Sequence, residues 1–459
     1  MYMGDSQSNK DPQKFGDDMK EQNILYWIWL ADRCGVASSE LVKLVEKYDD
    51  PFEIYRMDEE EIERIDGVSP KLKLRLMDRS LDSSYEILKY CQQKKIDIIC
   101  YRDKRYPSRL RTIQDPPAVL YVLGKMPNID DRLCIGMVGT RRMSEYGRDT
   151  AYTISYELAA ANAVIVSGMA LGIDGVSACG ALAAGGDTVA VLGCGISVVY
   201  PKEHGKLMRE IARNGAVITE YPPFERPHGY NFPKRNRIIS GLCHGVLIVE
   251  GSEGSGALIT AKKAIDQGRE LFALPGKVNE SNSDGPNELI KNGALVALSA
   301  DNILEHYDFL YHDCINYREF RKAKAGKVTV DKAIAKYGVA DIYSRDKSYR
   351  VNPVEKTEET VPPRTEVQTG AEDVGVEACA SPIADEKTQT AVEDSSAALL
   401  SMLDDTSRRV FEALPLDKAV TPDGIFVDGV GIGEIITALT MLEISGLVVS
   451  LPGGMYIRK

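Results

Sequence analysis

The chain has 459 residues and a formal net charge of −12 at pH 7, with 44% apolar and 27% charged residues. This balance is typical of a soluble globular protein, and the length suggests two to four domains. No apolar run approaches the roughly 20 residues that span a bilayer, and residues 1–20 lack the apolar core of a signal peptide, so we expect a cytoplasmic protein with no membrane partner.

Cysteine and histidine usage gives no sign of a metal site. The nine cysteines are scattered, contain no C-x-x-C pair and are odd in number, which favours reduced thiols over disulfides or a zinc knuckle. The five histidines show no H-x-x-x-H spacing. We therefore expect no metal.

Residues 21–105 are predicted to form a helical domain of the SAM-like or helix-hairpin-helix-like kind. Residues 23–35 and 38–48 carry apolar residues at helical spacing, with Ser38 or Ser39 as a candidate N-cap. Residues 59–77 are typical of two short helices around a tight turn, which is a weak helix-hairpin-helix pattern. The amides of such a turn can hold a phosphate, but a small helical packing module explains the pattern at least as well.

Residues 106–305 are predicted to form an α/β domain with an extended Rossmann-like parallel sheet. Apolar strands alternate with helical patterns, which indicates a parallel sheet covered on both faces. The expected strands are 133–140, 163–168, 187–193, 216–220, 245–250, 270–275 and 294–299, and the expected helices include 144–161, 172–185 and 256–268. Ligands of such sheets bind beyond the carboxyl ends of the strands, so function is sought in the loops there.

Three of these loops are rich in glycine. The first contains Gly139, Thr140 and Arg141, and the second is SGMALGIDG at 167–175. The third contains Gly254, Ser255 and Gly256 at the start of a helix. Each could hold a phosphate on backbone N–H groups, and the less favoured alternative for the second is that its glycines serve close helix–sheet packing. None matches G-x-G-x-x-G or a P-loop, so no nucleotide cofactor is expected.

Residues 226–237, RPHGYNFPKRNR, combine four cations with two aromatic rings after the strand 216–220. Cations neutralise phosphates, and an unstacked base gains roughly 1–3 kcal/mol by stacking on a ring, so the composition favours single-stranded nucleic acid. The alternative is a solvated loop with Tyr230 and Phe232 tucked into the core. No serine has a His/Asp pair and no two carboxylates have acid–base spacing, so we expect a binding surface and not an enzyme.

The remaining residues are predicted to form a linker and a last small domain. Residues 306–350 look basic and irregular, and residues 351–398 carry net −8 without an aromatic residue. A segment of this composition cannot bury enough apolar surface to fold, so 306–398 is interpreted as a basic, then acidic, disordered insert. Residues 399–459, two helices followed by a hairpin with its turn at 452–454, suggest a winged helix.

Taken together, these stretches resemble the DNA-processing protein A family (DprA, also called Smf). The matching stretches are YPSRLRTIQDPPAVLYVLG at 106–124, VGTRRMSEYG at 138–147, SGMALGIDG at 167–175, VLGCGISVVYP at 191–201, NFPKRNRIISGL at 231–242, GSGALITA at 254–261 and FALPG at 272–276. Their order and spacing make the resemblance specific over 21–305 and 399–459.

The resemblance implies a homodimer that binds single-stranded DNA, protects incoming strands in natural transformation and loads the RecA recombinase. It implies that the DNA-binding residues are Arg141, Ser167, Gly168, Phe232, Lys234, Arg235, Asn236 and Arg237, to which the glycine-rich loops add Gly139, Thr140, Gly254, Ser255 and Gly256. It also implies a dimer-forming edge at 287–298, with Asn287, Leu289, Ile290 and Val296 at the interface.

Two other functions stay open as alternatives. The fold is also similar to that of LOG-type nucleotide phosphoribohydrolases, but their P-G-G-x-G-T-x-x-E loop would place Thr260 at the catalytic glutamate and Ala257 at the threonine. The other alternative is a transcription factor that acts through the winged helix. Its candidate recognition helix, 432–445, has two glutamates and no Lys or Arg, so a protein-contact or regulatory role is expected.

The family pattern does not cover the insert, which gives rise to a separate hypothesis. Residues 314–350 carry net +6 with interspersed tyrosines, directly before the acidic tract. The basic arm would add a weak contact to single-stranded DNA, and the acidic tract would compete for it from within the chain. The alternative is a solvated tether whose opposite charges pair.

Overall fold

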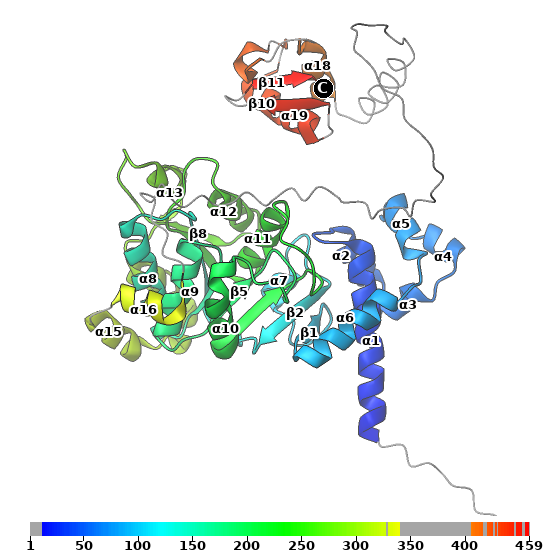
Figure 1. The fold of residues 1–459 in the computed structure, drawn as a ribbon, viewed down its shortest axis with the longest axis horizontal. Coiled ribbons are helices and arrows are strands. Elements are labelled where there is room, and N and C mark those ends of the chain that lie inside the picture. Colours follow the sequence, from blue (N-terminus) through cyan, green and yellow to red (C-terminus); the bar gives the residue numbers. More distant parts are fainter. Residues whose placement is uncertain are drawn as a thin grey trace, which may run out of the picture. The chain divides into compact units, whose positions relative to one another are not determined.

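The computed structural model describes residues 12–326, 329–339, 405–415, 420–425, 427–428, 430–444, 447–451 and 455–458. The described residues form two compact units, one within residues 1–358 and one within 359–459 (Figure 1). The acidic tract 351–398 lies outside the described residues, so its interpretation as a disordered linker stays a prediction.

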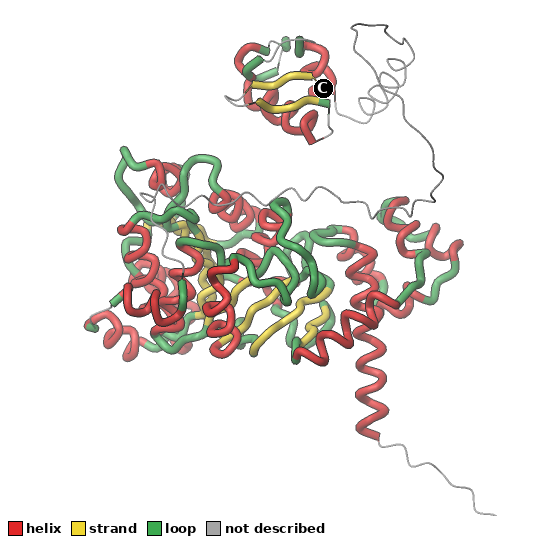
Figure 2. Tube along the Cα trace, viewed as in Figure 1, coloured by secondary structure: helices red, strands yellow, loops and turns green. Residues whose placement is uncertain are grey.

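A nine-stranded, mostly parallel sheet runs through the larger unit, between layers of helices (Figure 2). The strand order is β1-β2-β6-β5-β4-β3-β7-β8-β9, and the strands from β6 to β9 in this order are parallel. The strands are β1 (Asp97–Cys100), β2 (Val119–Gly124), β3 (Cys134–Val138), β4 (Val164–Ser167), β5 (Thr188–Val191), β6 (Gly215–Thr219), β7 (Gly245–Ile248), β8 (Glu270–Ala273) and β9 (Leu295–Val296). The predicted α/β class with a parallel sheet is confirmed.

The sheet begins earlier in the chain than the sequence predicts. β1 lies inside the predicted helical domain 21–105, yet it pairs antiparallel with β2, and β2 pairs antiparallel with β6. The apolar residues Ile98, Ile99 and Cys100 are buried in the sheet. A boundary at residue 105 would therefore separate an edge strand from its sheet.

Helices cover both faces of the sheet, and each face has its own apolar cluster. Successive residues of β4 alternate between the clusters, with Val164 and Val166 in one and Ile165 in the other, as strand geometry requires. One cluster contains residues of α8 (Glu145–Ala160), α9 (Ile173–Ala183) and α10 (Gly205–Asn214), and the other contains residues of α11 (Asn231–Leu242) and α12 (Gly256–Asp266).

The N-terminal helices share the cluster of α11 and α12. They are α1 (Pro12–Cys34), α2 (Glu40–Lys47), α3 (Pro51–Tyr55), α4 (Glu59–Glu63), α5 (Pro70–Leu76) and α6 (Asp82–Lys94), and α7 (Ser108–Arg111) follows β1. Ser39 precedes α2, but its side chain makes no capping hydrogen bond, whereas Ser69 caps α5 by accepting from the Leu72 amide. The helical character is as predicted, and a helix-hairpin-helix function stays a prediction.

The described residues of 306–326 and 329–339 are mostly helical, which corrects the expectation of an irregular basic segment. After α13 (Ser281–Lys291), the chain forms α14 (Ala300–Tyr311), the 3-10 turn η2 (His312–Cys314), α15 (Tyr317–Ala325) and α16 (Val330–Tyr337), whereas the 3-10 turn η1 (Lys202–His204) directly precedes α10. Phe320 and Tyr337 are buried in the cluster of α8 and α9. In the sequence, these few apolar residues are separated by many lysines and arginines, so the pattern does not reveal the buried helix faces.

The smaller unit has its own core. It consists of α18 (Asp405–Ala413), η3 (Pro422–Gly424), α19 (Ile432–Ile444), β10 (Val448–Leu451) and β11 (Met455–Arg458). Val410, Leu439 and Leu442 are fully buried in it. β10 and β11 pair antiparallel, which confirms the predicted hairpin. The winged-helix assignment stays a prediction.

Candidate functional site

The parallel strands β3, β4 and β5 end at one rim of the sheet, where three loops and the start of α11 meet. The loop after β3 turns at Gly139, where a Cβ would lie 2.6 Å from Ile173. Two residues later, Arg141 is exposed, and its guanidinium carbon lies 5.6 Å from the centre of the Phe232 ring. The loop thus places an arginine over an aromatic ring.

Glu250 fixes the loop after β3 through hydrogen bonds with Ser144. The Ser144 amide donates to its Oε2 at 2.9 Å, and the Ser144 hydroxyl donates to its Oε1. Glu250 is only 3% exposed. Burial raises the pKa of the Glu250 carboxyl, and the two hydrogen bonds from Ser144 oppose the shift. A buried carboxylate therefore positions the backbone that carries Arg141.

The loop after β4 supports the same site from the other side. Ser167 is buried and donates to the carbonyl of Met137 at 2.8 Å. The Gly168 amide donates to Asp174 Oδ2 at 3.0 Å, and a Cβ on Gly168 would lie 2.6 Å from both Asp174 and Arg235. Gly172 has φ +78° and would clash with the backbone of Thr140 if it carried a side chain. The glycines of this loop thus serve close packing between the two loops.

Arg235 lies close to the Phe232 ring but is buried within the molecule. It is 4% exposed and donates to the carbonyls of Gly168, at 3.0 Å, and Val191. Its guanidinium carbon is 5.9 Å from the ring centre of Phe232. Burial raises the pKa of the Asp174 carboxyl, and the positive charge of Arg235 opposes this shift. Asp174 and Arg235 are therefore two buried, opposite charges that stabilise each other electrostatically.

Phe232 is half-buried on the first turn of α11. Its ring lies 5.3 Å from that of Tyr200, and both residues line a cavity of about 30 Å³ together with Arg141 and Arg235. That volume holds about one water molecule and is too small for a base. Any stacking on Phe232 must therefore take place outside this cavity, and Arg141 is the exposed cation close to the ring.

The exposed residues around this ring extend the site along α11. Lys234 is exposed and its amine lies 5.8 Å from the ring centre of Tyr230, which is 62% exposed and stacks on the His228 ring at 5.3 Å. Asn236 donates weakly to the Gly256 carbonyl at 3.5 Å, which links α11 to the loop before α12. Gly254 and Gly256 are exposed there, beside half-buried Ser255.

Arg237 does not join the other predicted DNA-binding residues. It is 1% exposed, donates to Glu220 Oε2 at 2.6 Å and forms an ion pair with Asp115 at 3.2 Å. The Arg237 guanidinium is thus buried against Glu220 and Asp115, so a direct DNA contact does not fit its placement. Ser167 is likewise buried, and its role is packing of the loop.

The predicted dimer residues lie on α13 and at the sheet edge. Asn287 accepts from the Gly276 amide at 3.1 Å and donates to its carbonyl at 3.0 Å, so its side chain is used within the chain. Leu289 and Ile290 are half-buried, and Val296 is 43% exposed on β9, the last strand of the sheet. A partner contact through these residues stays a prediction.

Four residues near the rim escaped prediction as site residues. Tyr200 and Asp174 lie in stretches that carry the family resemblance, and Glu220 and Glu250 each directly or closely follow a strand. A carboxylate just after a buried strand is the signal that could have identified Glu220 and Glu250. Among the described residues, no group of three His, Cys, Asp or Glu could hold a metal ion, and no helix is long and apolar enough to cross a membrane.

Comparison with known proteins relates these features to one family. The family model of DNA recombination-mediator protein A matches residues 97–308. The DNA processing protein DprA of Bacillus subtilis is 41% identical over 219 residues, which cover 48% of this chain and 74% of that protein. Protein Smf of Escherichia coli is 39% identical over 235 residues, which cover 51% of this chain and 62% of that protein.

A solved structure agrees with these sequence matches. The X-ray structure of DNA processing protein A from Streptococcus pneumoniae superposes with a TM-score of 0.54 at 33% identity. The match covers 61% of this chain and 97% of that one. The residues matched by the family model, 97–308, include the rim described above.

Proposed function

We propose, from the premise that this chain belongs to the DNA recombination-mediator protein A family, that it binds single-stranded DNA at the rim formed by Arg141, Phe232 and Lys234. The observation that carries the proposal is the half-buried Phe232 ring with one exposed arginine and one buried arginine close to it. A ring of this kind takes a base, and the arginine beside it takes a phosphate. In duplex DNA the base faces are hidden, so the site would prefer single strands.

The experiment is a gel-shift titration of Phe232→Ala with a single-stranded oligonucleotide. Loss of one stacked base should weaken binding by roughly 1–3 kcal/mol, with an unchanged salt dependence because stacking releases no counterion. Phe224→Ala is the matched control, since Phe224 is 58% exposed and its ring packs on Tyr90. If both variants bind like the unaltered protein, the proposed stacking site is wrong.

The wider role that we propose is non-enzymatic. The protein would protect incoming single strands in natural transformation and load RecA on them in the cytoplasm, in keeping with the mediator description of its family. The residue that takes the place of the hydrolase glutamate, Thr260, is 1% exposed and hydrogen-bonds within its own helix, which does not favour nucleotide hydrolysis. A strand-exchange assay with RecA tests the loading: faster exchange in the presence of the protein supports it, and unchanged exchange contradicts it.

A homodimer through the β9 edge is part of the same proposal. Leu295 and Val296 leave an apolar strand edge 37% and 43% exposed, and such an edge readily pairs with another strand. Val296→Asp should shift the protein toward monomer in sedimentation analysis, because a charge would be buried at the interface. An unchanged mass would place the dimer contact elsewhere.

For the smaller unit we propose a winged helix that contacts protein. Its helix α19 contains Glu434 and Glu443 and no cation, whereas a helix in a DNA groove needs cations against phosphate. Unaltered affinity for single-stranded DNA after removal of 405–459 is the expected result, and a large loss of affinity would favour a DNA-binding role.

A further inference from the structure

Helix α10 connects the proposed DNA site with a cleft at the opposite end of the sheet. Pro201, directly before η1 and α10, lines the small cavity of the site together with Phe232. Arg213, on the last turn of α10, lines a cleft of about 730 Å³. β1, the loop after it, the segment after β2 and the start of β6 also line this cleft. A strand that follows α10 therefore passes from the site to the cleft.

The exposed face of α10 is basic. Lys206, Arg209 and Arg213 are exposed and follow one another at spacings of three and four residues, which places them on one face of the helix. Leu207 and Ile211 are buried on the apolar face. From Lys206 to Arg213 the helix rises by about 10 Å. The three cations therefore form a row that the phosphates of an extended strand can follow.

Two of these three cations are available to a ligand. Arg213 pairs with Glu210 at 2.6 Å. Lys206 and Arg209, in contrast, form no ion pair within the part of the chain that the structure describes. An exposed cation without a carboxylate partner can take a phosphate without first breaking an ion pair, so these two residues are the stronger part of the row.

Helix α16 borders the row and extends it. It packs beside α10, and a Cβ on Gly338 would lie 2.9 Å from the Cβ of Lys206. Lys336, two residues before Gly338, is exposed. The residues matched by the family model end at 308, so α16 adds a cation that the family pattern does not contain.

The cleft at the end of the row is also positively charged. Lys104 and Lys125 are exposed in its lining and form no ion pair among the described residues. Ile99 and Met126 add apolar surface. The lining contains five cations against three carboxylates, and each carboxylate already has a partner within the chain: Asp97 with Arg105, Asp130 with Ser108 and Asp187 with Arg132. The cleft therefore attracts phosphates.

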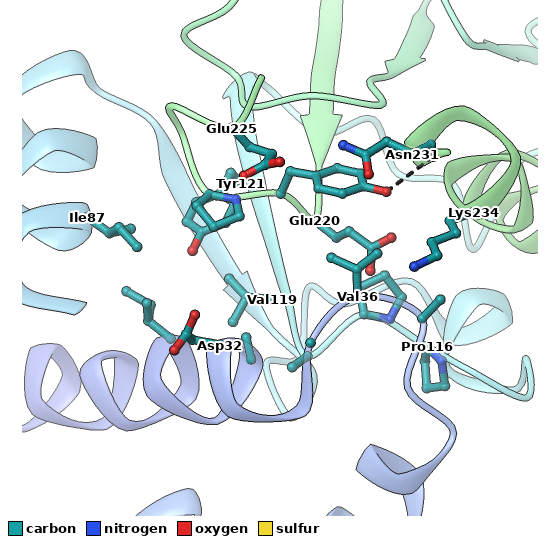
Figure 3. Close-up of a pocket in the computed structure, with 18 of the residues that line it drawn as sticks. Asp32, Val36, Ile87, Pro116, Val119, Tyr121, Glu220, Glu225, Asn231 and Lys234 are labelled. Atoms are coloured by element: carbon teal, nitrogen blue, oxygen red, sulfur yellow. Dashed lines mark hydrogen bonds between the residues drawn. The ribbon is translucent and has the colours of Figure 1, made fainter. Parts of the chain in front are cut away.

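The other side of the first turn of α11 offers a strand no comparable path. Figure 3 shows the cavity of about 280 Å³ on that side, which α1, β2, the segment after β6 and α11 line. Three carboxylates, from Asp32, Glu220 and Glu225, stand there against two cations, from Arg75 and Lys234. The balance of charge thus directs phosphates toward α10.

We propose that single-stranded DNA leaves the Phe232 site along α10, with phosphates on Lys206 and Arg209, and enters the cleft that contains Lys104 and Lys125. Contacts to phosphates carry no sequence information, so this part of the path takes any sequence. The inference rests on the proposed single-strand binding, and it extends the bound length from the stacked base at Phe232 to several nucleotides.

The test measures the affinity of the full-length protein for oligothymidylates of increasing length at several salt concentrations. Lys206→Ala/Arg209→Ala should bind the shortest strand that the unaltered protein retains with unchanged affinity, because this strand reaches only the Phe232 site. On long strands, the slope of log affinity against log salt concentration should be lower by roughly 1.4, which is the loss of two phosphate contacts on a single strand.

Lys89→Ala/Lys94→Ala is the matched control. Both lysines are exposed on α6, which packs in the apolar cluster of the other sheet face, and the variant removes the same charge. It should leave the slope unchanged at every length. If Lys206→Ala/Arg209→Ala also has the unaltered slope on long strands, the inference is overturned, and the proposed function stands as long as the unaltered protein binds single strands. No binding of any strand would contradict the proposed function itself.

A second double variant tests the end of the path. Lys104→Ala/Lys125→Ala should lower the slope only for strands longer than those on which Lys206→Ala/Arg209→Ala first shows its loss, since the strand reaches the cleft after α10. This order of lengths supports the proposed path. An unaltered slope of the cleft variant at every length, or a loss already on the shortest strand in either variant, would overturn it.

Discussion

At the scale of single residues, similar side chains on the rim have different physical roles. Arg141 and Arg235 both flank the Phe232 ring, but Arg141 is exposed on a loop, whereas Arg235 is buried and hydrogen-bonded to two carbonyl groups. Replacing Arg235 would disrupt the pair with Asp174 and the packing of Gly168, so weaker DNA binding in such a variant would not identify a phosphate contact. Arg141 is the residue at which phosphate binding can be tested directly.

We predict that Arg141→Ala weakens single-strand binding and reduces its salt dependence. Loss of one phosphate contact should lower the slope of log affinity against log salt concentration by roughly 0.7. The measurement is a binding titration at several salt concentrations. Arg142→Ala is the matched control, because Arg142 is exposed next in the chain but approaches no ring of the site among the contacts of the described residues. Identical slopes for Arg141→Ala and the unaltered protein would contradict the assignment.

At the scale of elements, His244 joins three of them at the end of the sheet opposite the site. It immediately precedes β7, its Nδ1 accepts from the Cys134 amide of β3 at 3.0 Å, and its Nε2 hydrogen-bonds with the Tyr311 hydroxyl of α14. Burial, reinforced by the positive charge of Arg109, lowers the pKa of His244 from 6.5 to about 3. The native protein therefore holds this histidine neutral over a range in which the unfolded chain protonates it.

We predict that this histidine makes the protein less stable in mild acid. Between its unfolded pKa of 6.5 and its folded pKa of about 3, the unfolded state binds one more proton, so the free energy of unfolding falls as the pH decreases through this window. The slope from one such group is at most about 1.4 kcal/mol per pH unit. His244→Asn offers an amide oxygen to the Cys134 N–H and cannot titrate.

Urea unfolding of both proteins at a series of pH values provides the measurement. Buried acids such as Asp174 and Glu250 have raised pKa values and contribute the opposite slope, but they are the same in both proteins. The difference between the two free energies should therefore shrink or change sign as the pH falls below 6.5. A constant difference from neutral pH to mild acid would show that His244 is not held neutral by the fold.

At the scale of the whole molecule, the structure changes how the charged insert should be tested. Residues 317–325 and 330–337 form α15 and α16, whose buried Phe320 and Tyr337 pack against α8 and α9. Deleting 314–398 would therefore expose an apolar core. Weaker DNA binding of that variant could then come either from a lost DNA contact or from lost folding. Deleting 340–398 retains both helices and still removes Arg345, Lys347 and Arg350.

We predict that removal of 351–398 alone tightens single-strand binding at low salt. The tract carries net −8, and a tethered acidic segment competes with DNA phosphates at a high effective concentration. Removal of 340–398 should abolish part of this gain, because it also takes away three cations. Equal affinities of both deletions and the full chain in a low-salt titration would mean that the insert is only a spacer.

The amino-acid sequence by itself determined the sheet, its parallel strands, the loops at its rim and the family. These follow from local patterns, since apolar strands alternate with helices and glycines stand where strands end, and such patterns survive without knowledge of distant contacts. Even Phe232 and Arg141 could be recognised this way, because each lies in a short stretch whose composition suits a phosphate or a base.

Burial was decided only by the tertiary structure. Arg235 and Arg237 stand two residues apart in one basic stretch. On α11, however, Arg235 lies close to the Phe232 ring, whereas Arg237 pairs with Glu220 and Asp115. Likewise, the 280 Å³ cavity exists because α1, β2 and the end of β6, which are distant in the chain, come together around Glu220. Which cation meets solvent and which meets a buried carboxylate depends on these long-range contacts, and no local pattern records them.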